Sequence, residues 1–418
     1  AARGAFQVEA ACGASFAGDT RDLDRFRSAR AGRTIVSMPA GAIYLDHNAT
    51  TPPDPRVMEA VGRALAVAWG NPSSVHAPGL AARETLQSAR DEAARLVGVD
   101  SSEVVFTSGG TEAIALAVAS AWRRREAGRR RVVVSAVEHP AVLEAARGLA
   151  SEGAEVVVCP VDGEGRVDLE ALRARVDETT ALVAVMLANN EVGALQPAAA
   201  AAAIAARAGA RFLCDAIQAV GKIAVTARAI GADYLPIAAH KLNGPKGAGC
   251  LCVRHGAPCV PMIAGGGQEG GLRSGTENVP GLAGFGEACR LARERTGEQE
   301  RIAARRDALQ ERLVSGGGAQ VLAAHAERLP NTIGCILDGV DAEALVVRLS
   351  RRGVFISAGS ACHAGKTKGS HVLAAMGVPE PRRASFVRVS LGAGTTDEEA
   401  DRAAAVIVEE AARIRRKR

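Results

Sequence analysis

Two reactive side chains stand in sequence settings that suit chemistry, although they lie far apart along the chain. Lys241 follows His240 at the end of an apolar run and precedes the turn-forming sequence Leu-Asn-Gly-Pro-Lys-Gly (242–247). Cys362 lies among small residues in Ser-Ala-Gly-Ser-Ala-Cys-His-Ala-Gly (357–365). A lysine at such a junction can bind an aldehyde cofactor as a Schiff base, and a cysteine on a loop can accept a sulfur atom. Together they predict pyridoxal 5'-phosphate (PLP) chemistry at a sulfur atom.

Further polar residues follow strand-like apolar runs, which is where parallel sheets bind their ligands. Gly110 and Thr111 open a helix, so backbone N–H groups and a hydroxyl could hold a phosphate. His139 could stack on a planar ring. Asp215 could pair with a pyridinium nitrogen, and Gln218 could reach the phenolic oxygen of the same ring. Each residue alone is also explained by helix capping or a satisfied buried polar group. Their succession at strand ends favours one ligand site.

The elements that would position these residues alternate between strands and helices from residue 41 onward. We expect strands at 104–106, 131–135, 154–158, 181–187, 211–214, 234–238 and 249–253. We expect one helix that ends near residue 122, a second that begins at residue 140 and a third over 198–208. This alternation predicts an α/β fold with a mostly parallel seven-stranded sheet, helices on its faces and right-handed crossovers.

The pattern changes after residue 281 and reads as a smaller α+β domain. We expect one long Arg/Glu-rich helix at about 281–315, strands at 332–337, 354–357 and 385–390, and a final helix near Thr396. The sequence Thr-Asp-Glu-Glu (396–399) has the character of a capping box, which marks the start of that helix.

The chain is therefore expected to have three parts. Residues 1–40 read as a poorly ordered extension, because they lack the basic start and apolar core of a secretory signal, and their acidic residues count against a transit peptide. A large PLP-binding domain is expected over 41–280, with its first segment contributing to the small domain. The small domain is expected over 281–418 and carries Cys362.

Composition narrows the functional class. The 418 residues are 48% hydrophobic, with a net charge of +5. Basic blocks with interleaved aromatic residues are missing, which argues against nucleic-acid binding. The chain also lacks an uninterrupted apolar run long enough for a membrane span. Nine cysteines are scattered through apolar runs and do not form a disulfide framework, so a reducing cytoplasm is expected.

Cys250, Cys252 and Cys259 raise the question of a metal site. A two-residue step in a strand places both side chains on one face, and no His/Cys pair follows at zinc spacing. We therefore interpret these cysteines as buried strand thiols and expect no resident metal. Cys362, with His363 and His371, could contact iron transiently during cluster transfer.

The chain resembles the cysteine desulfurases, fold-type-I PLP enzymes related to class V aminotransferases, over about residues 43–407. The matching segments are Tyr-Leu-Asp-His-Asn-Ala-Thr-Thr-Pro (44–52), Asn-Pro-Ser-Ser-Val-His (71–76), Thr-Ser-Gly-Gly-Thr-Glu (107–112), Glu-His (138–139), Asn-Asn-Glu-Val-Gly (189–193), Asp-Ala-Ile-Gln-Ala-Val-Gly-Lys (215–222), His-Lys-Leu-Asn-Gly-Pro-Lys-Gly (240–247), Gly-Gly-Gly-Gln-Glu (265–269), Arg-Ser-Gly-Thr-Glu-Asn (273–278), Ser-Ala-Gly-Ser-Ala-Cys (357–362) and Val-Arg-Val-Ser-Leu-Gly (387–392).

The resemblance implies how PLP is held. Lys241 would bind the cofactor covalently and later move the Cα proton, while His139 stacks on the ring and takes part in catalysis. Asp215 would pair with the ring nitrogen. The residues implied to contact the ring oxygen or the phosphate are Gln218, Asn190, Gly110, Thr111, His240 and, across a subunit interface, Thr276. The family pattern therefore also implies a homodimer with shared sites.

The resemblance also implies the reaction and its partners. Arg388 would grip the carboxylate of L-cysteine, with Asn48 on the substrate side. Cys362 would take the sulfur as a persulfide, leaving L-alanine, and pass it to an acceptor such as an iron–sulfur scaffold protein. The thiolate needs a lowered pKa or a base. His363 is a candidate base, and a neutral loop histidine is the equal alternative.

The sequence departs from the family pattern at three places, and two alternative functions remain open. Ala238 replaces a family hydroxyl residue, Gly270 replaces an arginine, and Ile114-Ala115 stands where the family has asparagine. These departures bear on cofactor affinity and loop behaviour. Selenocysteine lyases share similar segments, including Ser-His-Val-Leu-Ala-Ala-Met-Gly (370–377). A weakly active sulfur-relay scaffold is a further alternative, which the reactive residues above disfavour.

Overall fold

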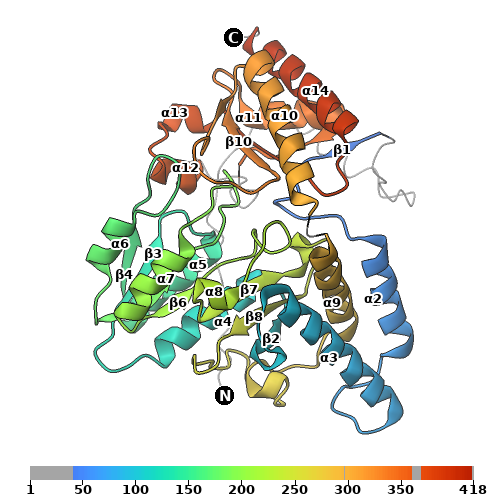
Figure 1. Ribbon diagram of the computed structural model, residues 1–418, viewed down its shortest axis with the longest axis vertical. Coiled ribbons are helices and arrows are strands. Elements are labelled where there is room, and N and C mark those ends of the chain that lie inside the picture. Colours follow the sequence, from blue (N-terminus) through green and yellow to red (C-terminus); the bar gives the residue numbers. More distant parts are fainter. Residues whose placement is uncertain (1–40, 296, 360–368, 417–418) are drawn as a thin grey trace, which may run out of the picture. The chain divides into compact units, whose positions relative to one another are not determined.

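The computed structural model describes residues 41–295, 297–359 and 369–416 (Figure 1). The extension predicted at 1–40 and Cys362 lie outside the described residues.

A seven-stranded sheet forms the centre of the larger part, in the order β2-β8-β7-β6-β5-β3-β4 (Figure 1). Its strands are β2 (Val104–Thr107), β3 (Arg131–Ser135), β4 (Glu155–Cys159), β5 (Thr180–Ala184), β6 (Arg211–Leu213), β7 (Tyr234–Ala238) and β8 (Gly249–Val253). Only β8 runs antiparallel to its neighbours within this sheet. The predicted α/β fold with a mostly parallel seven-stranded sheet is therefore confirmed.

Apolar residues face both sides of this sheet, because helices cover both of its faces. Val132 and Val134 pack into one hydrophobic cluster, and Val133 between them packs into another. The first cluster includes the helices α4 (Gly110–Arg123) and α5 (Pro140–Gly148). The second includes α2 (Pro55–Val67), α3 (Ala77–Val97), α6 (Leu169–Arg175), α7 (Ala198–Arg207), α8 (Ala227–Ile230) and α9 (Val279–Glu294).

A second core lies in the later part of the chain (Figure 1). Its antiparallel sheet has the order β12-β10-β9, from β9 (Gln320–Val321), β10 (Thr332–Ile336) and β12 (Phe386–Ser390). The early strand β1 (Ile43–Tyr44) pairs in parallel with β11 (Val354–Phe355). The helices that contribute buried residues are α10 (Gln299–Gly317), α11 (Ala342–Arg351) and α14 (Asp397–Arg415). Two short helices, α12 (His371–Ala375) and α13 (Glu380–Arg383), precede β12.

The single helix predicted over 281–315 is wrong. The chain forms α9 and α10 instead, and Gly297 between them has φ of +118°, which interrupts the helical backbone. α9 contributes its apolar face to the core of the large sheet, whereas α10 packs against α14 in the second core. Because of this break, the two halves of one charged, helix-prone sequence pack into different hydrophobic cores.

The start of α14 follows the predicted capping box. The Thr396 hydroxyl accepts a hydrogen bond from the Glu399 N–H at 3.1 Å, and the Glu399 carboxylate accepts one from the Thr396 N–H at 3.0 Å. The division into domains at residue 280 remains a prediction. In the described ranges, every helix is too short or too polar to cross a membrane.

Candidate active site

The polar residues singled out in the sequence follow the carboxyl ends of parallel strands. The turn before Gly110 follows β2, His139 follows β3, Asn190 follows β5, Asp215 follows β6 and Lys241 follows β7. Because these strands are parallel, their carboxyl ends meet at one edge of the sheet, where ligands of open α/β sheets bind.

The turn between β2 and α4 is built for close approach of an anion. Gly109 has φ of +152°, and α4 begins without a side-chain hydrogen bond at its N-cap, so its first N–H groups point outward. A Cβ on Gly110 would lie 2.3 Å from Cδ1 of Ile217 and 3.6 Å from Cβ of Ala238. This turn, called the cradle below, therefore packs on apolar side chains. The next residue, Thr111, is exposed and supplies a hydroxyl.

Lys241 ends the 3₁₀ turn η4 (Ala239–Lys241), directly after β7. Its ammonium donates hydrogen bonds to the main-chain oxygens of Asn48 and Ala49, the latter at 2.9 Å. A lysine amine held on main-chain oxygens at the strand edge suits covalent attachment of an aldehyde cofactor.

Asp215 is a buried carboxylate that follows β6, the strand next to β7 in the sheet. Its Oδ1 accepts a hydrogen bond from the Ile217 N–H at 3.0 Å, and only 5% of the residue is exposed. Burial raises the pKa of Asp215 to about 6, although that hydrogen bond and the charge of Lys241 act in the opposite direction. A buried carboxylate of this kind fits a cationic ring nitrogen.

His139 caps the helix α5. Its Nδ1 accepts a hydrogen bond from the Ala141 N–H at 3.1 Å, so the neutral ring carries its hydrogen on Nε2. The cap fixes the imidazole at the strand edge.

His240 directly precedes Lys241 in the chain and is held by a residue of the N-terminal segment. Its Nδ1 lies 3.2 Å from the hydroxyl of Thr50. Burial, followed by the charge of Lys241, lowers the pKa of His240 to about 4, so the ring is neutral at neutral pH.

Asn48 joins the two cores at the site. Its side-chain amide donates to the main-chain oxygen of Asn190 at 3.2 Å and to the Thr332 hydroxyl at 2.9 Å. Its main-chain oxygen accepts from Gln218 Nε2 at 2.8 Å, and its N–H donates to Ser390 Oγ at 3.0 Å. The predicted substrate-side residue therefore contacts a cofactor-side residue directly.

Arg388 brings a buried guanidinium from β12 to the same place. Its Nη1 donates to the main-chain oxygen of Asn190 at 3.0 Å, and its Nη2 pairs with Asp46 at 2.7 Å. Its Nε is buried and has no hydrogen-bond partner among the described residues. A buried, incompletely paired guanidinium fits an anionic ligand such as a carboxylate.

Thr276 lies apart from this cluster. It is exposed and lines a surface hollow with Ser108, Gly247 and Arg273, and neither Lys241 nor its partners Asn48 and Ala49 line that hollow. Within this chain, the structure does not bring Thr276 to the lysine.

Two site residues were missed by sequence reasoning. Lys222 donates to the side chains of Gln218 and Asn48, and Glu138 is fully buried with its Oε1 on the Met186 N–H at 2.7 Å. Burial raises the pKa of Glu138 to about 8, and the charge of Asp215 adds to this. Both residues belong to the matching segments, which was the available signal.

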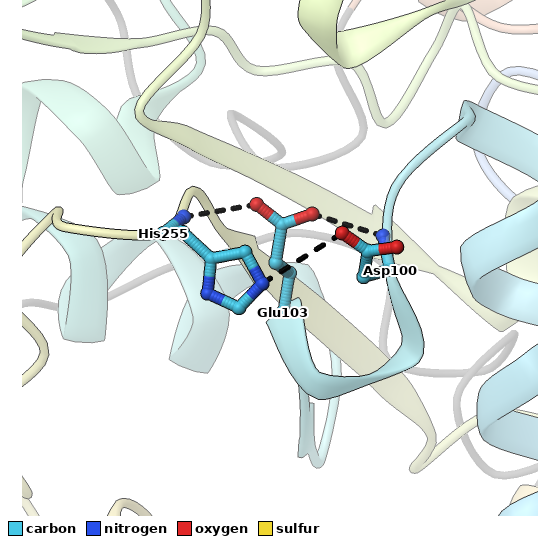
Figure 2. A group of neighbouring side chains, drawn as sticks. All are labelled: Asp100, Glu103 and His255. Atoms are coloured by element: carbon cyan, nitrogen blue, oxygen red, sulfur yellow. Dashed lines mark hydrogen bonds and ion pairs between the residues drawn. The ribbon is translucent and has the colours of Figure 1, made fainter.

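One group of side chains elsewhere has the composition of a metal site, as Figure 2 shows. Asp100, Glu103 and His255 lie at the start of β2 and beyond the end of β8, at the opposite edge of the sheet. The Glu103 carboxylate accepts hydrogen bonds from the N–H groups of Asp100 and His255, both at 2.9 Å. Arg228 pairs with Asp100 at 2.6 Å. The carboxylates are therefore already engaged by donors of the protein.

The prediction of buried strand thiols is confirmed for Cys250 and Cys252, which are buried in β8, where the neighbouring thiol of Cys252 and then burial raise the pKa of Cys250. Thiols in such surroundings are unreactive. The prediction is wrong for Cys259, which lies beyond the end of β8 and is only partly buried, because the chain has left the sheet there.

Comparison with known proteins shows the family of the chain. The model of the family described as aminotransferase class V matches residues 43–403. The chain therefore belongs to the class V aminotransferase family of PLP-dependent enzymes.

Within that family the relatives are cysteine desulfurases. A cysteine desulfurase of Bradyrhizobium diazoefficiens is 43% identical over 375 residues, which cover 89% of this chain and 95% of the relative. A solved structure named as a NifS-like protein has a TM-score of 0.82 at 37% identity and covers 88% of this chain and 98% of that one. A structure described as SspA in complex with cysteine has a TM-score of 0.74 at 29% identity, covering 84% and 98%.

Proposed function

We propose that this protein, a PLP enzyme of the cysteine desulfurase group, uses Lys241 and Cys362 to convert L-cysteine to L-alanine and an enzyme-bound persulfide. The observation that carries the proposal is that Lys241 and the buried Asp215 follow the carboxyl ends of the neighbouring strands β7 and β6, at the end of the sheet that also carries the Gly110 cradle. An aldehyde cofactor with a ring nitrogen and a phosphate matches these three features.

The proposed cofactor contacts follow from these positions. Lys241 would hold the aldehyde carbon, Asp215 the ring nitrogen and His139 the ring face. The phosphate would lie on the N–H groups of α4, with Gly110, Thr111 and His240 around it, and the ring oxygen would face Gln218 and Asn190. When bound, PLP supplies an electron sink for the bonds broken at the amino-acid substrate.

The substrate would be oriented by its carboxylate. Arg388 has one buried N–H without a hydrogen-bond partner among the described residues, and Asn48 links Arg388's neighbour Asn190 to the lysine. A small amino acid bound there would place its Cα hydrogen toward Lys241. We propose that the Lys241 amine moves that proton and that Nε2 of His139 exchanges protons with the substrate thiol.

Sulfur transfer would take place at Cys362. The thiolate attacks the substrate sulfur, so an S–S bond forms while the C–S bond breaks. The electron pair of that bond stays on carbon, which takes up a proton to become the methyl group of alanine. The products are a Cys362 persulfide and L-alanine.

Both flanks of the Cys362 segment are attached to the site, which supports this role. Ser357 exchanges two main-chain hydrogen bonds with Arg388, at 2.8 and 3.1 Å. On the other side, the Ser370 hydroxyl donates to Glu191 at 2.6 Å, and His371 Nε2 lies 2.9 Å from the main-chain oxygen of Glu138. The chain therefore leaves and re-enters beside residues of the site.

We also infer a homodimer in which Thr276 reaches the phosphate of the neighbouring subunit. Exposed apolar side chains gather at the end of α2 and before α3, including Trp69 (69% exposed) and Val75 (86%). Arg273 pairs with Glu112 of α4 at 2.7 Å, which holds the segment in place, while Thr276 in the same segment is exposed and accessible to a neighbouring subunit. A second copy covering the apolar residues would bury them and complete both sites.

We infer that the persulfide passes to an acceptor protein such as an iron–sulfur scaffold, and that the protein works in the cytoplasm. The described cysteines are free thiols, and those in the strands are buried. A reducing compartment preserves such thiols and the persulfide chemistry.

Lys241→Ala tests the proposal. The purified protein, given L-cysteine or L-selenocysteine separately, should release alanine with sulfide or selenide and absorb visible light. The variant should lose turnover, the visible band and the adduct that borohydride traps, whereas the exposed Lys246→Ala should keep all three. A trapped adduct that persists in Lys241→Ala would contradict the assignment. Release of alanine from selenocysteine alone would favour a selenocysteine lyase.

A further inference from the structure

Lys222 is a lysine of the site for which neither the sequence nor the proposed reaction has a task. It lines a cavity together with His47, Lys241 and Asn331. Its ammonium contacts two amide oxygens, Gln218 Oε1 at 2.6 Å and Asn48 Oδ1 at 3.1 Å. Among the described residues, no carboxylate pairs with it. The amides of Gln218 and Asn48 therefore hold the Lys222 side chain in place, and Lys222 in turn orients both amides.

Two contacts determine which way the Gln218 amide faces, one from Lys222 to its oxygen and one from its NH₂ to a main-chain oxygen. The nitrogen of Lys222 donates its hydrogens, so the oxygen of the Gln218 amide turns toward it and the NH₂ turns away. That NH₂ donates to the main-chain oxygen of Asn48 at 2.8 Å, the same oxygen that accepts from Lys241. The amide NH₂ and the amine of Lys241 therefore converge on one atom.

The Asn48 side chain is held in the same way. Its Oδ1 accepts from Lys222 and from Asn331 Nδ2, each at 3.1 Å, which leaves its own NH₂ directed at Thr332 and Asn190. One lysine thus fixes two amides that face the site from different parts of the chain.

The charged neighbours of Lys222 are cations. Burial, then the charges of Lys241 and Arg388, lower the pKa of Lys222 well below that of an ordinary lysine, and Lys222 in turn lowers the pKa of His47. The amine and the ammonium each have at least two hydrogens, which is the number that the two amide oxygens require. The geometry therefore holds in either protonation state.

We propose that Lys222 is a positioning residue that fixes the Gln218 amide with its NH₂ toward the ring oxygen of the cofactor bound at Lys241. This inference rests on the proposed function. An amide has nearly the same shape after a half-turn, so without Lys222 only the contact with the Asn48 main-chain oxygen opposes the orientation in which the Gln218 oxygen faces the ring oxygen and removes a donor from it. With the cofactor bound, its ring oxygen would share a proton with the nitrogen that Lys241 contributes, so a donor from Gln218 to that oxygen would tune the basicity of the nitrogen.

The test is a pH titration of the visible absorption of the PLP-loaded protein. In Lys222→Met the midpoint between the two absorbing forms should rise by about one pH unit, because the ring oxygen loses a donor to its negative charge and holds the shared proton more tightly. Lys222→Gln keeps an N–H donor and should return the midpoint most of the way. Lys246→Met removes a nearby exposed charge and should leave the midpoint unchanged.

A double-variant cycle separates orientation from charge. In a Gln218→Ala background, Lys222→Met should shift the midpoint no further. An equal shift in both backgrounds, or no shift in Lys222→Met, would overturn the inference. Lys222→Ala, in which water can fill the space, replaces the Met variant if that variant does not fold. A wild-type protein without a visible band would instead overturn the proposed function itself.

Discussion

Cys362 is the residue on which the proposed sulfur transfer depends, and its competitors can be judged from their burial. Six of the seven described cysteines are buried, and Cys259 is the partly exposed one. Burial raises the pKa of Cys214, Cys289 and Cys335. A thiol that is buried and protonated is a poor nucleophile.

Cys362→Ala should keep the cofactor and lose sulfur transfer. We expect an unchanged visible band and less than about one hundredth of the alanine release, because a nucleophile is removed and no proposed cofactor contact changes. Mass spectrometry after one turnover should find the added sulfur on Cys362 of the wild-type protein. Cys259→Ala is the matched control and should desulfurate normally. Sulfur on Cys250 or Cys252 would contradict the mechanism.

Glu138 makes the folding stability depend on pH. Its pKa is raised from an ordinary carboxyl value to about 8 in the folded protein, mainly by burial. Between about pH 5 and 8 the folded state therefore keeps a proton that the unfolded chain releases. The stability that Glu138 contributes is largest below this window and falls as the pH rises through it, by up to about 1.4 kcal/mol per pH unit.

Glu138→Gln should flatten that dependence. Glutamine keeps an oxygen for the Met186 N–H and does not ionise, so the difference between the melting temperatures at pH 5.5 and pH 8 should shrink. Glu152→Gln, on the exposed turn after α5, should leave the difference as in the wild type. An unchanged difference in Glu138→Gln would show that Glu138 does not carry the proton.

At the level of single residues, the sequence predicted the positions of Asp215 and Lys241 better than those of the residues that contact the site from other strands. Asp215 and Lys241 stand at strand ends, which local patterns reveal. Lys222 and Glu138 act through residues that other strands bring to them, as in the Glu138 contact with the Met186 N–H. β5 ends at Ala184, before the predicted end, and beyond it the N–H of Met186 bonds the Glu138 side chain and the N–H of Leu187 bonds the Asp215 main chain. Such pairings depend on strand order, which one sequence does not show.

At the scale of elements, the phosphate cradle depends on how β8 passes beneath it. A Cβ on Gly249 would lie 2.6 Å from the main-chain oxygen of Ile237 and 2.9 Å from Cα of Gly109. These are backbone atoms of β7 and of the turn before α4, and they cannot move aside as a side chain can. The absence of a side chain on β8 therefore sets the position of the turn.

Gly249→Ala should weaken cofactor binding. The added methyl group must push the Gly109 turn away from its place, so we expect PLP to bind at least about tenfold more weakly, together with a lower melting temperature. PLP affinity is measured by titrating the cofactor-free protein and following the visible band. Gly148→Ala, at a helical position with open space around its Cβ, is the control and should bind PLP normally. Normal affinity in Gly249→Ala would refute the role of β8.

The helices show where element patterns mislead. Charge and helix propensity continue from α9 into α10, so the sequence alone reads as one helix. Gly297 and the separate cores of the two helices decide otherwise, and the second of these is a tertiary effect.

At the scale of the whole molecule, the exposed apolar residues around the end of α2 predict the oligomeric state. Leu65 on α2 is 61% exposed, and Trp69 directly follows that helix. The double substitution Leu65→Asp with Trp69→Asp should convert the proposed dimer to a monomer, because it would bury two charges in an apolar interface. Light scattering measures the mass, and loss of PLP should accompany dissociation if Thr276 crosses the interface.

Val347→Asp is the control for that experiment, because Val347 is similarly exposed on α11, away from α2. It should leave the mass and the cofactor content unchanged. A wild-type monomer with full activity would show that each chain carries a complete site.

The contacts of Asn48 also determine when the cofactor site can form during translation. This asparagine near the beginning of the chain is bonded to Ser390 near its end, 342 residues later, and to Gln218 and Lys241 between them. A nascent chain that has not yet produced β12 therefore lacks the strand that holds Asn48 in contact with Lys241. We expect cofactor capture to wait until translation has nearly finished. Ribosome-bound chains stalled before β12 should be colourless, whereas released chains acquire the visible band.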